Sequence, residues 1–305
     1  MHLLPTSEIR LDDGEDAVDL SLPPGDVLVL SFADSDLSAI SAAARDCDLT
    51  VRLASLRRLR HPLSVDLLIE KTVAKTRFVL VRCLGGLDYW RYGIEQLSET
   101  CRAKGIALAV LPGDDRDDAR LAEYGTVPLA CARAILSYFH AGGGAENMRR
   151  LLAVAAGYLG RDRPSSNFAP LPLPSLFALG SNASPTPWRE ALAALPDPPF
   201  VPILVYRSAV SAGDTGAGEA LAAALVARGQ APLILALTSL KDLTVTAELA
   251  ALIAKRRPAA IVTTTAFSAR EGADFVLDDA NCPVFQAMPV GSARDAWAAS
   301  ARGLS

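Results

Sequence analysis

The sequence predicts an α/β protein with two parallel-sheet modules. Apolar runs of strand length alternate with amphipathic helical patterns through most of the 305 residues, and this alternation is typical of parallel sheets covered by helices. The pattern is interrupted by a proline-rich stretch at residues 161–199. We therefore expect two Rossmann-like or flavodoxin-like modules, residues 1–160 and 200–305, joined by a proline-rich crossover over residues 161–199.

The first module is expected to contain four strands with helices between them. The third apolar run, RFVLVRC, is rich in β-branched and aromatic side chains, which favour strands. The expected strands are Asp26–Ala33, Thr50–Ala54, Arg77–Cys83 and Ala107–Leu111. Helical patterns lie at Leu37–Ala44, Val65–Ala74, Leu129–Phe139 and Met148–Leu159.

The clearest helix follows the third strand. Its apolar residues recur with a period of 3.6 and share one face; they are Trp90, Ile94, Leu97 and Cys101. Asp88 is expected to cap its start, and Gly105 stands where a left-handed stop belongs.

The proline-rich stretch is expected to be an extended connection, because proline removes backbone donors and disfavours helix. A disordered tether is one alternative. We favour an ordered crossover, since the stretch offers too much apolar area to leave in water. That area comes from Phe168, Leu171, Leu173, Leu176, Phe177 and Trp188.

The second module repeats the alternation of strands and helices. Its expected strands are Val201–Arg207, Pro232–Leu237, Ala259–Thr265 and Pro283–Met288. One helix is expected over Asp214–Arg228, capped by Asp214 and stopped by Gly229, and another carries Leu249, Leu252 and Ile253 on one face.

Composition excludes several classes of protein. Thirty basic and thirty-four acidic residues give a net charge of −4, which does not favour nucleic acid or an anionic membrane. No apolar run approaches the roughly 20 residues that span a bilayer, and Met1–Arg10 lacks the pattern of a signal peptide. Five cysteines without C-x-x-C suit reduced thiols, and the three histidines form no zinc motif. We expect a cytoplasmic protein without a bound metal.

Candidate binding residues follow the strands of the second module, because open parallel sheets bind ligands beyond the carboxyl ends of their strands. The loop at Gly213 and the helix after it present backbone N–H groups suited to a carboxylate or phosphate, and Arg207 adds a bidentate donor. The candidates are Tyr206, Arg207, Ser208, Asp214, Thr215, Thr264 and Thr265. Two alternatives stay open: Asp214 and Thr215 simply cap a helix, and the threonine run is ordinary strand.

The first module offers one further candidate. Gly85-Gly86 allows a tight turn after a buried strand, and Tyr89 beside it is a candidate for stacking on a planar ligand or a partner surface. Trp90 is assigned instead to the helix stripe. The sequence contains no G-x-x-x-x-G-K-[ST], no G-x-G-x-x-G and no G-x-S-x-G, so no P-loop, dinucleotide site or nucleophile elbow is indicated.

These stretches resemble the large subunit of cobaltochelatase and, more distantly, that of magnesium chelatase. The resemblance begins at Val81-Arg82-x-Leu84-Gly85-Gly86, Tyr89-Trp90-Arg91-Tyr92-Gly93 and Leu111-Pro112-Gly113-Asp114-Asp115. It continues at Tyr206-Arg207-Ser208, Gly213-Asp214-Thr215, Thr264-Thr265-Ala266-Phe267, Cys282-Pro283-Val284-Phe285-Gln286, Ala296-Trp297 and Arg302-Gly303-Leu304-Ser305. The pieces are in order and cover most of the chain. Gly216-Ala217 departs from the Ala-Pro that the resemblance leads us to expect.

The resemblance implies a role in cobalamin biosynthesis. The family's large subunit holds hydrogenobyrinic acid a,c-diamide while cobalt(II), a substrate, is inserted, and two smaller AAA+-type partner subunits hydrolyse ATP. Family members are several times longer, so we expect an amino-terminal segment that is inactive alone and that contains no catalytic residue of its own. The alternative is a stand-alone, non-catalytic tetrapyrrole-binding or scaffold protein. An unrelated periplasmic-binding-like sensor is disfavoured by the lack of an export signal.

Overall fold

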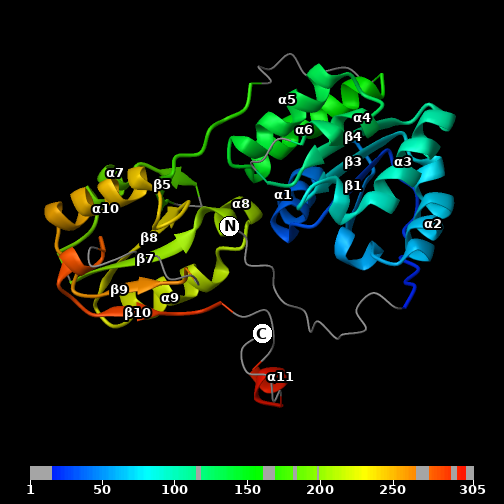
Figure 1. Ribbon diagram of the computed structural model, residues 1–305. Coiled ribbons are helices and arrows are strands. Elements are labelled where there is room, and N and C mark those ends of the chain that lie inside the picture. The colour runs from blue at the N-terminus through cyan, green and yellow to red at the C-terminus, as the bar shows by residue number, and fades with distance from the viewer. Residues whose placement is uncertain are drawn as a thin grey trace. The chain divides into compact units, whose positions relative to one another are not determined.

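The chain forms two compact units, each built around a sheet (Figure 1). The computed structural model describes residues 16–114, 118–160, 169–180, 184–197, 199–265, 275–289 and 294–299. One unit is formed by Ile9–Pro172 and the other mainly by Leu173–Ser305. One sheet is wholly parallel and the other mostly so, which confirms the predicted α/β class with two parallel-sheet modules.

The sheet of the first unit has the strand order β2-β1-β3-β4 among the described residues, with every pair parallel. Its strands are β1 (Val27–Ser31), β2 (Val51–Ser55), β3 (Phe78–Cys83) and β4 (Ala107–Pro112). They match the four expected strands to within a few residues. Every residue of β1 and β3 is buried, because the two central strands are covered on both faces and are accordingly almost continuous apolar runs.

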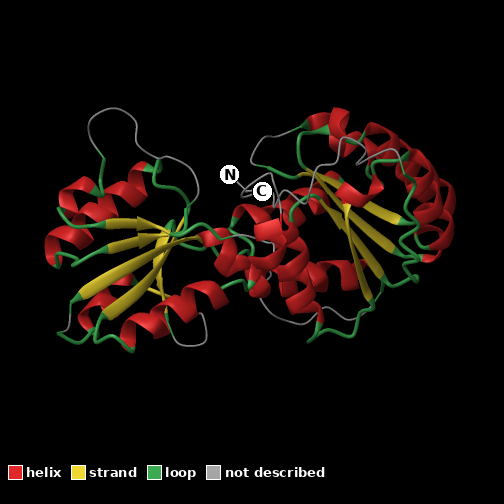
Figure 2. Cartoon of the chain, turned by 90° about the horizontal axis from the view of Figure 1, so that it is seen from below, coloured by secondary structure: helices red, strands yellow, loops and turns green. Residues whose placement is uncertain are grey.

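Helices cover both faces of this sheet (Figure 2). They are α1 (Asp34–Ala44), α2 (Pro62–Lys71), α3 (Arg91–Lys104), α4 (Ala119–Tyr124), α5 (Leu129–His140) and α6 (Gly144–Tyr158). Residues of α2 and α3 pack in one buried cluster with one face of the sheet. Residues of α1, α5 and α6 form a second cluster on the other face.

Helix α3 confirms the predicted stripe and stop but not the predicted cap. Its four stripe residues are buried, and Gly105 ends the helix with φ 66°. Asp88 is not the cap, since it lies in a 3₁₀ turn, Leu87–Tyr89, and the capping position is Trp90, which makes no side-chain cap bond. The chain passes through this turn after Gly86, so the helix begins three residues later than Asp88.

The second sheet has the order β10-β9-β7-β8-β5-β6 among the described residues. Four of its strands run parallel to one another: β7 (Phe200–Tyr206), β8 (Ala231–Leu237), β9 (Ile261–Thr263) and β10 (Val284–Gln286). All four were expected. The helices of this unit are α7 (Trp188–Ala193), α8 (Arg207–Ala212), α9 (Gly216–Val226), α10 (Leu243–Lys255) and α11 (Arg294–Ala299).

Part of the proline-rich stretch belongs to this sheet. Residues expected to form only a connection supply β5 (Leu176–Leu179), β6 (Pro185–Thr186) and α7, and β5 pairs antiparallel with β8. Of the six apolar residues, Leu176, Phe177 and Trp188 are buried, Leu173 is half-buried and Leu171 is 43% exposed. Phe168 lies outside the described residues. The tether alternative is therefore wrong for this part of the stretch.

Candidate functional site

Seven of the eight predicted site residues lie at the carboxyl-end edge of the second sheet. Tyr206 ends β7, Arg207 and Ser208 begin α8, and the pair Thr264-Thr265 follows β9. The chain runs from β7 to β8 on one side and then returns to β9 on the other, so the strand order reverses between β7 and β9. A crevice for ligands is expected at such a reversal.

The threonine run joins neighbouring strands. The backbone N–H and the Oγ1 of Thr264 donate to the carbonyl of Leu204 on β7, at 2.8 and 3.1 Å. Thr263 and Thr265 are buried, and their Oγ1 atoms lie 2.8 Å apart. Gln286 Nε2 of β10 donates to the carbonyl of Thr265 at 2.8 Å. These contacts favour the structural alternative for the run, although Thr264 itself stays half-buried at the edge of the sheet.

Arg207 is oriented by a backbone contact. Its Nη1 donates to the carbonyl of Leu173 at 3.0 Å, which fixes the half-buried guanidinium beside the segment that leads into β5. Tyr206 and Ser208 are also half-buried. The three consecutive residues thus place two hydroxyl groups and one held guanidinium at the end of the central strand.

The loop between α8 and α9 corrects the predicted cap. Gly213 ends α8 with φ 72°, and Asp214 is exposed and lies before the capping position. Thr215 occupies that position without a cap bond, and its Oγ1 donates instead to Glu219 Oε1 at 2.8 Å. The expectation that Asp214 caps the helix is wrong because the unpredicted helix α8 moves the start of α9 to Gly216.

Asp242, in the loop after β8, caps helix α10 with its side chain. Asp242 Oδ1 accepts from the backbone N–H groups of Thr244 and Val245 at 2.9 and 3.4 Å, and its Oδ2 accepts from Thr238 Oγ1 at 2.7 Å. The hydrogen bond from Thr238, followed by those from the two N–H groups, holds the pKa of the Asp242 carboxyl below its ordinary value.

Asp242→Ala is expected to lower the free energy of unfolding at neutral pH by about 1–2 kcal/mol, because α10 loses its cap. The folded-state pKa is depressed, so this stabilisation is fully present above the unfolded-state pKa and is lost as the pH falls through the lower folded-state pKa. Urea unfolding at several pH values should show the deficit shrinking below about pH 4. Asp242→Asn, which keeps a capping oxygen, is the matched control; an equal deficit in both variants would contradict the cap.

A mostly buried polar cluster lies at the corresponding reversal of strand order in the first sheet. Strand order reverses between β1 and β3, and there Arg82 Nη2 donates to the carbonyl of Gly113 at 2.8 Å, while its Nε lies 3.6 Å from Asp36 Oδ2. Ser31 Oγ donates to the same carboxylate oxygen at 2.9 Å, and the guanidinium carbon lies over the ring of Phe139, 3.9 Å from its centroid. Sequence reasoning missed this cluster; the signal was an arginine within the apolar run of β3.

Tyr89 is the one predicted site residue that lies in the first unit; the other seven lie in the second. Its side chain is 57% exposed and meets Phe32 edge-on, with ring centroids 5.1 Å apart. The turn that presents it follows Gly85 and Gly86, whose φ values are 88° and 78°. Trp90 is buried and its Nε1 donates to the carbonyl of Leu59 at 2.8 Å, so its assignment to the core is confirmed.

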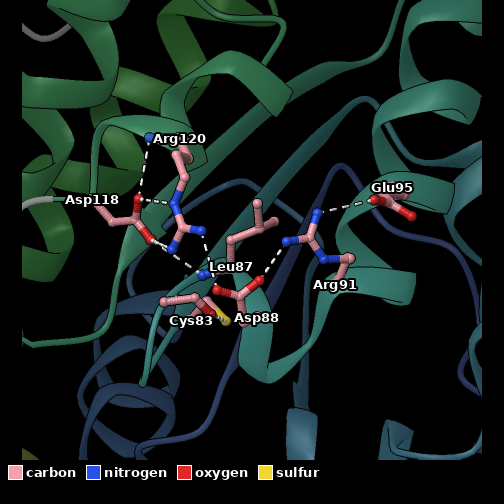
Figure 3. Close-up of polar contacts among 8 residues, drawn as sticks. Cys83, Leu87, Asp88, Arg91, Glu95, Asp118 and Arg120 are labelled. Atoms are coloured by element: carbon pink, nitrogen blue, oxygen red, sulfur yellow. Dashed lines mark hydrogen bonds and ion pairs between the residues drawn. The ribbon is translucent and has the colours of Figure 1, made fainter.

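A ladder of alternating charges surrounds this turn (Figure 3). Arg120 pairs with Asp118 at 3.0 Å and with Asp88 at 3.1 Å, and Arg91 bridges Asp88 to Glu95. The guanidinium of Arg91, and then that of Arg120, hold the pKa of the exposed Asp88 carboxyl below its ordinary value. Because Asp118 Oδ2 also accepts from the N–H of Leu87 at 3.3 Å, the ladder ties the start of α4 to the turn.

Other possible chemistry is limited in the described part of the chain. Burial raises the pKa of the Cys83 thiol to about 12 and that of Cys101 to about 12, which keeps both protonated. Among the described residues, His, Cys, Asp and Glu side chains form no group of three suited to a metal ion. His61 caps α2, with Nδ1 accepting from Leu63 N at 3.1 Å. Nor is any described helix long and apolar enough to cross a bilayer.

A groove of about 760 Å³ lies at the opposite, amino-terminal edge of the first sheet. Arg77, Arg102 and Lys104 contribute to its wall. The two arginines donate to the carbonyls of Leu159 and Glu123, and the last turn of α3 is complemented by Arg102 and Lys104. These basic side chains therefore stabilise the ends of neighbouring helices.

Comparison with known proteins places this architecture in a family. The family model described as CobN/Magnesium Chelatase matches residues 136–305. Two curated relatives, each named aerobic cobaltochelatase subunit CobN, are 35% identical over 318 residues (Sinorhizobium sp.) and 32% identical over 310 residues (Pseudomonas aeruginosa). Each alignment covers 100% of this chain and 25% of the relative, so the chain spans about a quarter of their length.

A solved structure agrees with this placement. The catalytic subunit of cobaltochelatase from Mycobacterium tuberculosis superposes with a TM-score of 0.63 and 27% identity, over 93% of this chain and 23% of that one. The predicted resemblance to the cobaltochelatase large subunit is confirmed by these matches. The chain belongs to the CobN/magnesium chelatase family.

Proposed function

We propose that the chain acts as the amino-terminal part of the corrin-binding large subunit of an ATP-dependent cobaltochelatase. The reaction is the insertion of cobalt(II) into hydrogenobyrinic acid a,c-diamide during cobalamin biosynthesis, in the cytoplasm. The observation that carries the proposal is 35% identity to a named cobaltochelatase subunit over the whole of this chain. Two smaller AAA+-type subunits are the proposed partners and supply ATP hydrolysis.

The proposed contribution of this chain is to bind and orient the corrin. A corrin of this class carries peripheral carboxylate and amide groups around an extended ring. Arg207 matches a carboxylate through charge-assisted hydrogen bonds, and the hydroxyls of Tyr206 and Ser208 suit amide and carboxylate groups. The hydroxyls of Thr215 and Thr264 already donate to Glu219 and Leu204, so they suit the N–H groups of an amide as acceptors. These residues share one sheet edge with the exposed Asp214.

The two remaining candidates have narrower proposed roles. The exposed ring of Tyr89 offers a face for stacking on a large planar ligand. Thr265 is buried and bonded to Thr263, so its proposed role is to hold the neighbouring Thr264 in place. Loss of two pyrrole protons during metal insertion requires a base, and we assign that base to no residue of this chain.

A titration tests the binding role. Addition of metal-free hydrogenobyrinic acid a,c-diamide to the chain, followed by absorbance, is expected to saturate at tens of micromolar. Arg207→Ala is expected to weaken binding about tenfold or more, because a charge-assisted contact contributes roughly 1.5–3 kcal/mol. Thr264→Val is expected to weaken it less, since one neutral hydrogen bond contributes about 1 kcal/mol.

Matched controls separate binding from folding. Arg228→Ala removes another arginine that donates to a backbone carbonyl, that of Ala224 at 2.9 Å, and urea unfolding of every variant reports stability. Unchanged affinity in both Arg207→Ala and Thr264→Val would remove this edge as the binding site. Absence of any binding by the wild-type chain would remove the corrin-binding role of the isolated chain.

The second candidate is a stand-alone, non-catalytic tetrapyrrole-binding or scaffold protein. Both candidates predict corrin binding, but only the first predicts that the chain can replace the matching quarter of an active large subunit.

A further inference from the structure

Strand β10 differs from the other parallel strands of its sheet in being uncovered. All three of its residues are exposed, whereas all three of the neighbouring β9 are buried. Phe285 is 58% exposed, Val284 44%, and Met288 just after the strand 51%. Parallel strands are normally buried on both faces. Because Val284 and Phe285 point to opposite faces, neither face of β10 is covered by the described residues.

The backbone of β10 is also open on one side. Its partner β9 donates from Ile261 N to the carbonyl of Pro283 at 2.9 Å, and Ala287 N donates to the carbonyl of Thr263 at 2.8 Å. Hydrogen bonding alternates along a parallel strand, so the N–H and C=O groups of Val284 and Gln286 point away from β9. In the described sheet β10 is the terminal strand (Figure 1).

This edge lacks the usual protection against pairing. Edge strands are commonly blunted by charged side chains, by internal prolines or by bulges. The segment PVFQAMP, residues 283–289, carries no charge, and its prolines stand only at the two ends. An uncharged edge with free backbone groups and apolar side chains on both faces is suited to the addition of an extended segment.

We propose that β10 is an attachment edge on which another part of the large subunit adds a strand. The occupant is an apolar, extended segment from the three quarters of the family's polypeptide that this chain does not match. Its side chains, or a helix that follows it, cover Val284 and Phe285. The inference rests on family membership and on β10, and is independent of the metal or corrin used.

A proline substitution separates the open edge from the paired one. Val284→Pro removes an outward N–H that β9 does not use, so the isolated chain should unfold at the same urea concentration as the control Val284→Thr. Each variant would be co-produced with the remaining three quarters of the Sinorhizobium relative as a separate polypeptide. We expect the wild type and Val284→Thr to co-elute with it in size-exclusion chromatography, and Val284→Pro to bind at least about tenfold more weakly.

Hydrogen exchange on the intact Sinorhizobium protein makes the test independent of whether its remainder folds alone. At the strand aligned with β10, the amides aligned with Val284 and Gln286 are expected to exchange at least about tenfold more slowly than in the isolated chain. Equal exchange in the two samples would overturn the proposal, as would equal binding by Val284→Pro and Val284→Thr. A dimer of the isolated chain that Val284→Pro dissociates would instead make a second copy the occupant, which also overturns it.

Discussion

Arg82→Met is expected to lower the free energy of unfolding of the chain by about 3–5 kcal/mol, which is the cost of removing one partner from a buried ion pair. Arg82 is 6% exposed, bonds the Gly113 carbonyl and lies beside the Asp36 carboxylate. Without the guanidinium that carboxylate stays in a mostly buried position, where Ser31 Oγ still donates to it. Methionine fills most of the volume but supplies no donor.

A double-mutant cycle checks the cause. Asp36→Leu combined with Arg82→Met is expected to lose much less stability than the two single losses added together, because the second change removes the uncompensated charge. Arg82→Lys is the charge-conserving control and should fall between wild type and Arg82→Met, since lysine lacks the planar group that lies over Phe139. Additive losses in urea unfolding, or a loss under 1 kcal/mol for Arg82→Met, would contradict the role of the cluster.

Gly93→Ala is expected to destabilise the chain by about 3 kcal/mol, although alanine is the better helix former by about 1 kcal/mol. A Cβ at Gly93 would lie 2.2 Å from Cε2 and Cζ2 of the Trp90 ring. The ring cannot move aside cheaply, because it is 6% exposed and its Nε1 is bonded to the Leu59 carbonyl.

The chain offers a matched control for this substitution. At Gly218, also within a helix, the nearest atoms to a new Cβ are Val205 Cγ1 at 3.6 Å and Ile234 Cδ1 at 3.7 Å. Gly218→Ala should therefore stabilise the chain by up to about 1 kcal/mol. Gly93→Ala is also expected to lower the free energy of unfolding by less in a Trp90→Leu background than in the wild type, because the ring that the new Cβ meets is gone. A stabilising Gly93→Ala would show that the two residues are not in contact.

The parts of the fold that the sequence predicted are those whose burial leaves a local pattern. β1, β3, β7 and β8 are apolar runs because they are interior strands of their sheets, and α3 shows its stripe because one face is buried. Helix α8 was missed because none of its residues is buried, so no period is imposed on them. β5 and β6 were missed because proline signals argue against regular structure and both strands are short.

The sequence predicted where the candidate residues lie in the fold, but not which groups they contact. The rule for parallel sheets places Tyr206, Arg207 and Thr264 at one edge from sequence alone. It does not reveal that Arg207 bonds Leu173 and that Thr264 bonds Leu204, because those partners depend on how distant segments meet. The Arg82 cluster was hidden for the same reason: its members come from β1, α1, β3, the loop after β4 and α5.

The proposed role in cobalt insertion is tested most directly by a chimera. The quarter of the Sinorhizobium cobaltochelatase subunit that matches this chain would be replaced by this chain, and ATP-dependent insertion of cobalt(II) into hydrogenobyrinic acid a,c-diamide would be measured with the partner subunits. We predict insertion within about tenfold of the unmodified subunit, a change of about 1.4 kcal/mol in the barrier. A folded chimera that binds its partners and the corrin but inserts no cobalt would contradict this account and favour the stand-alone binding protein.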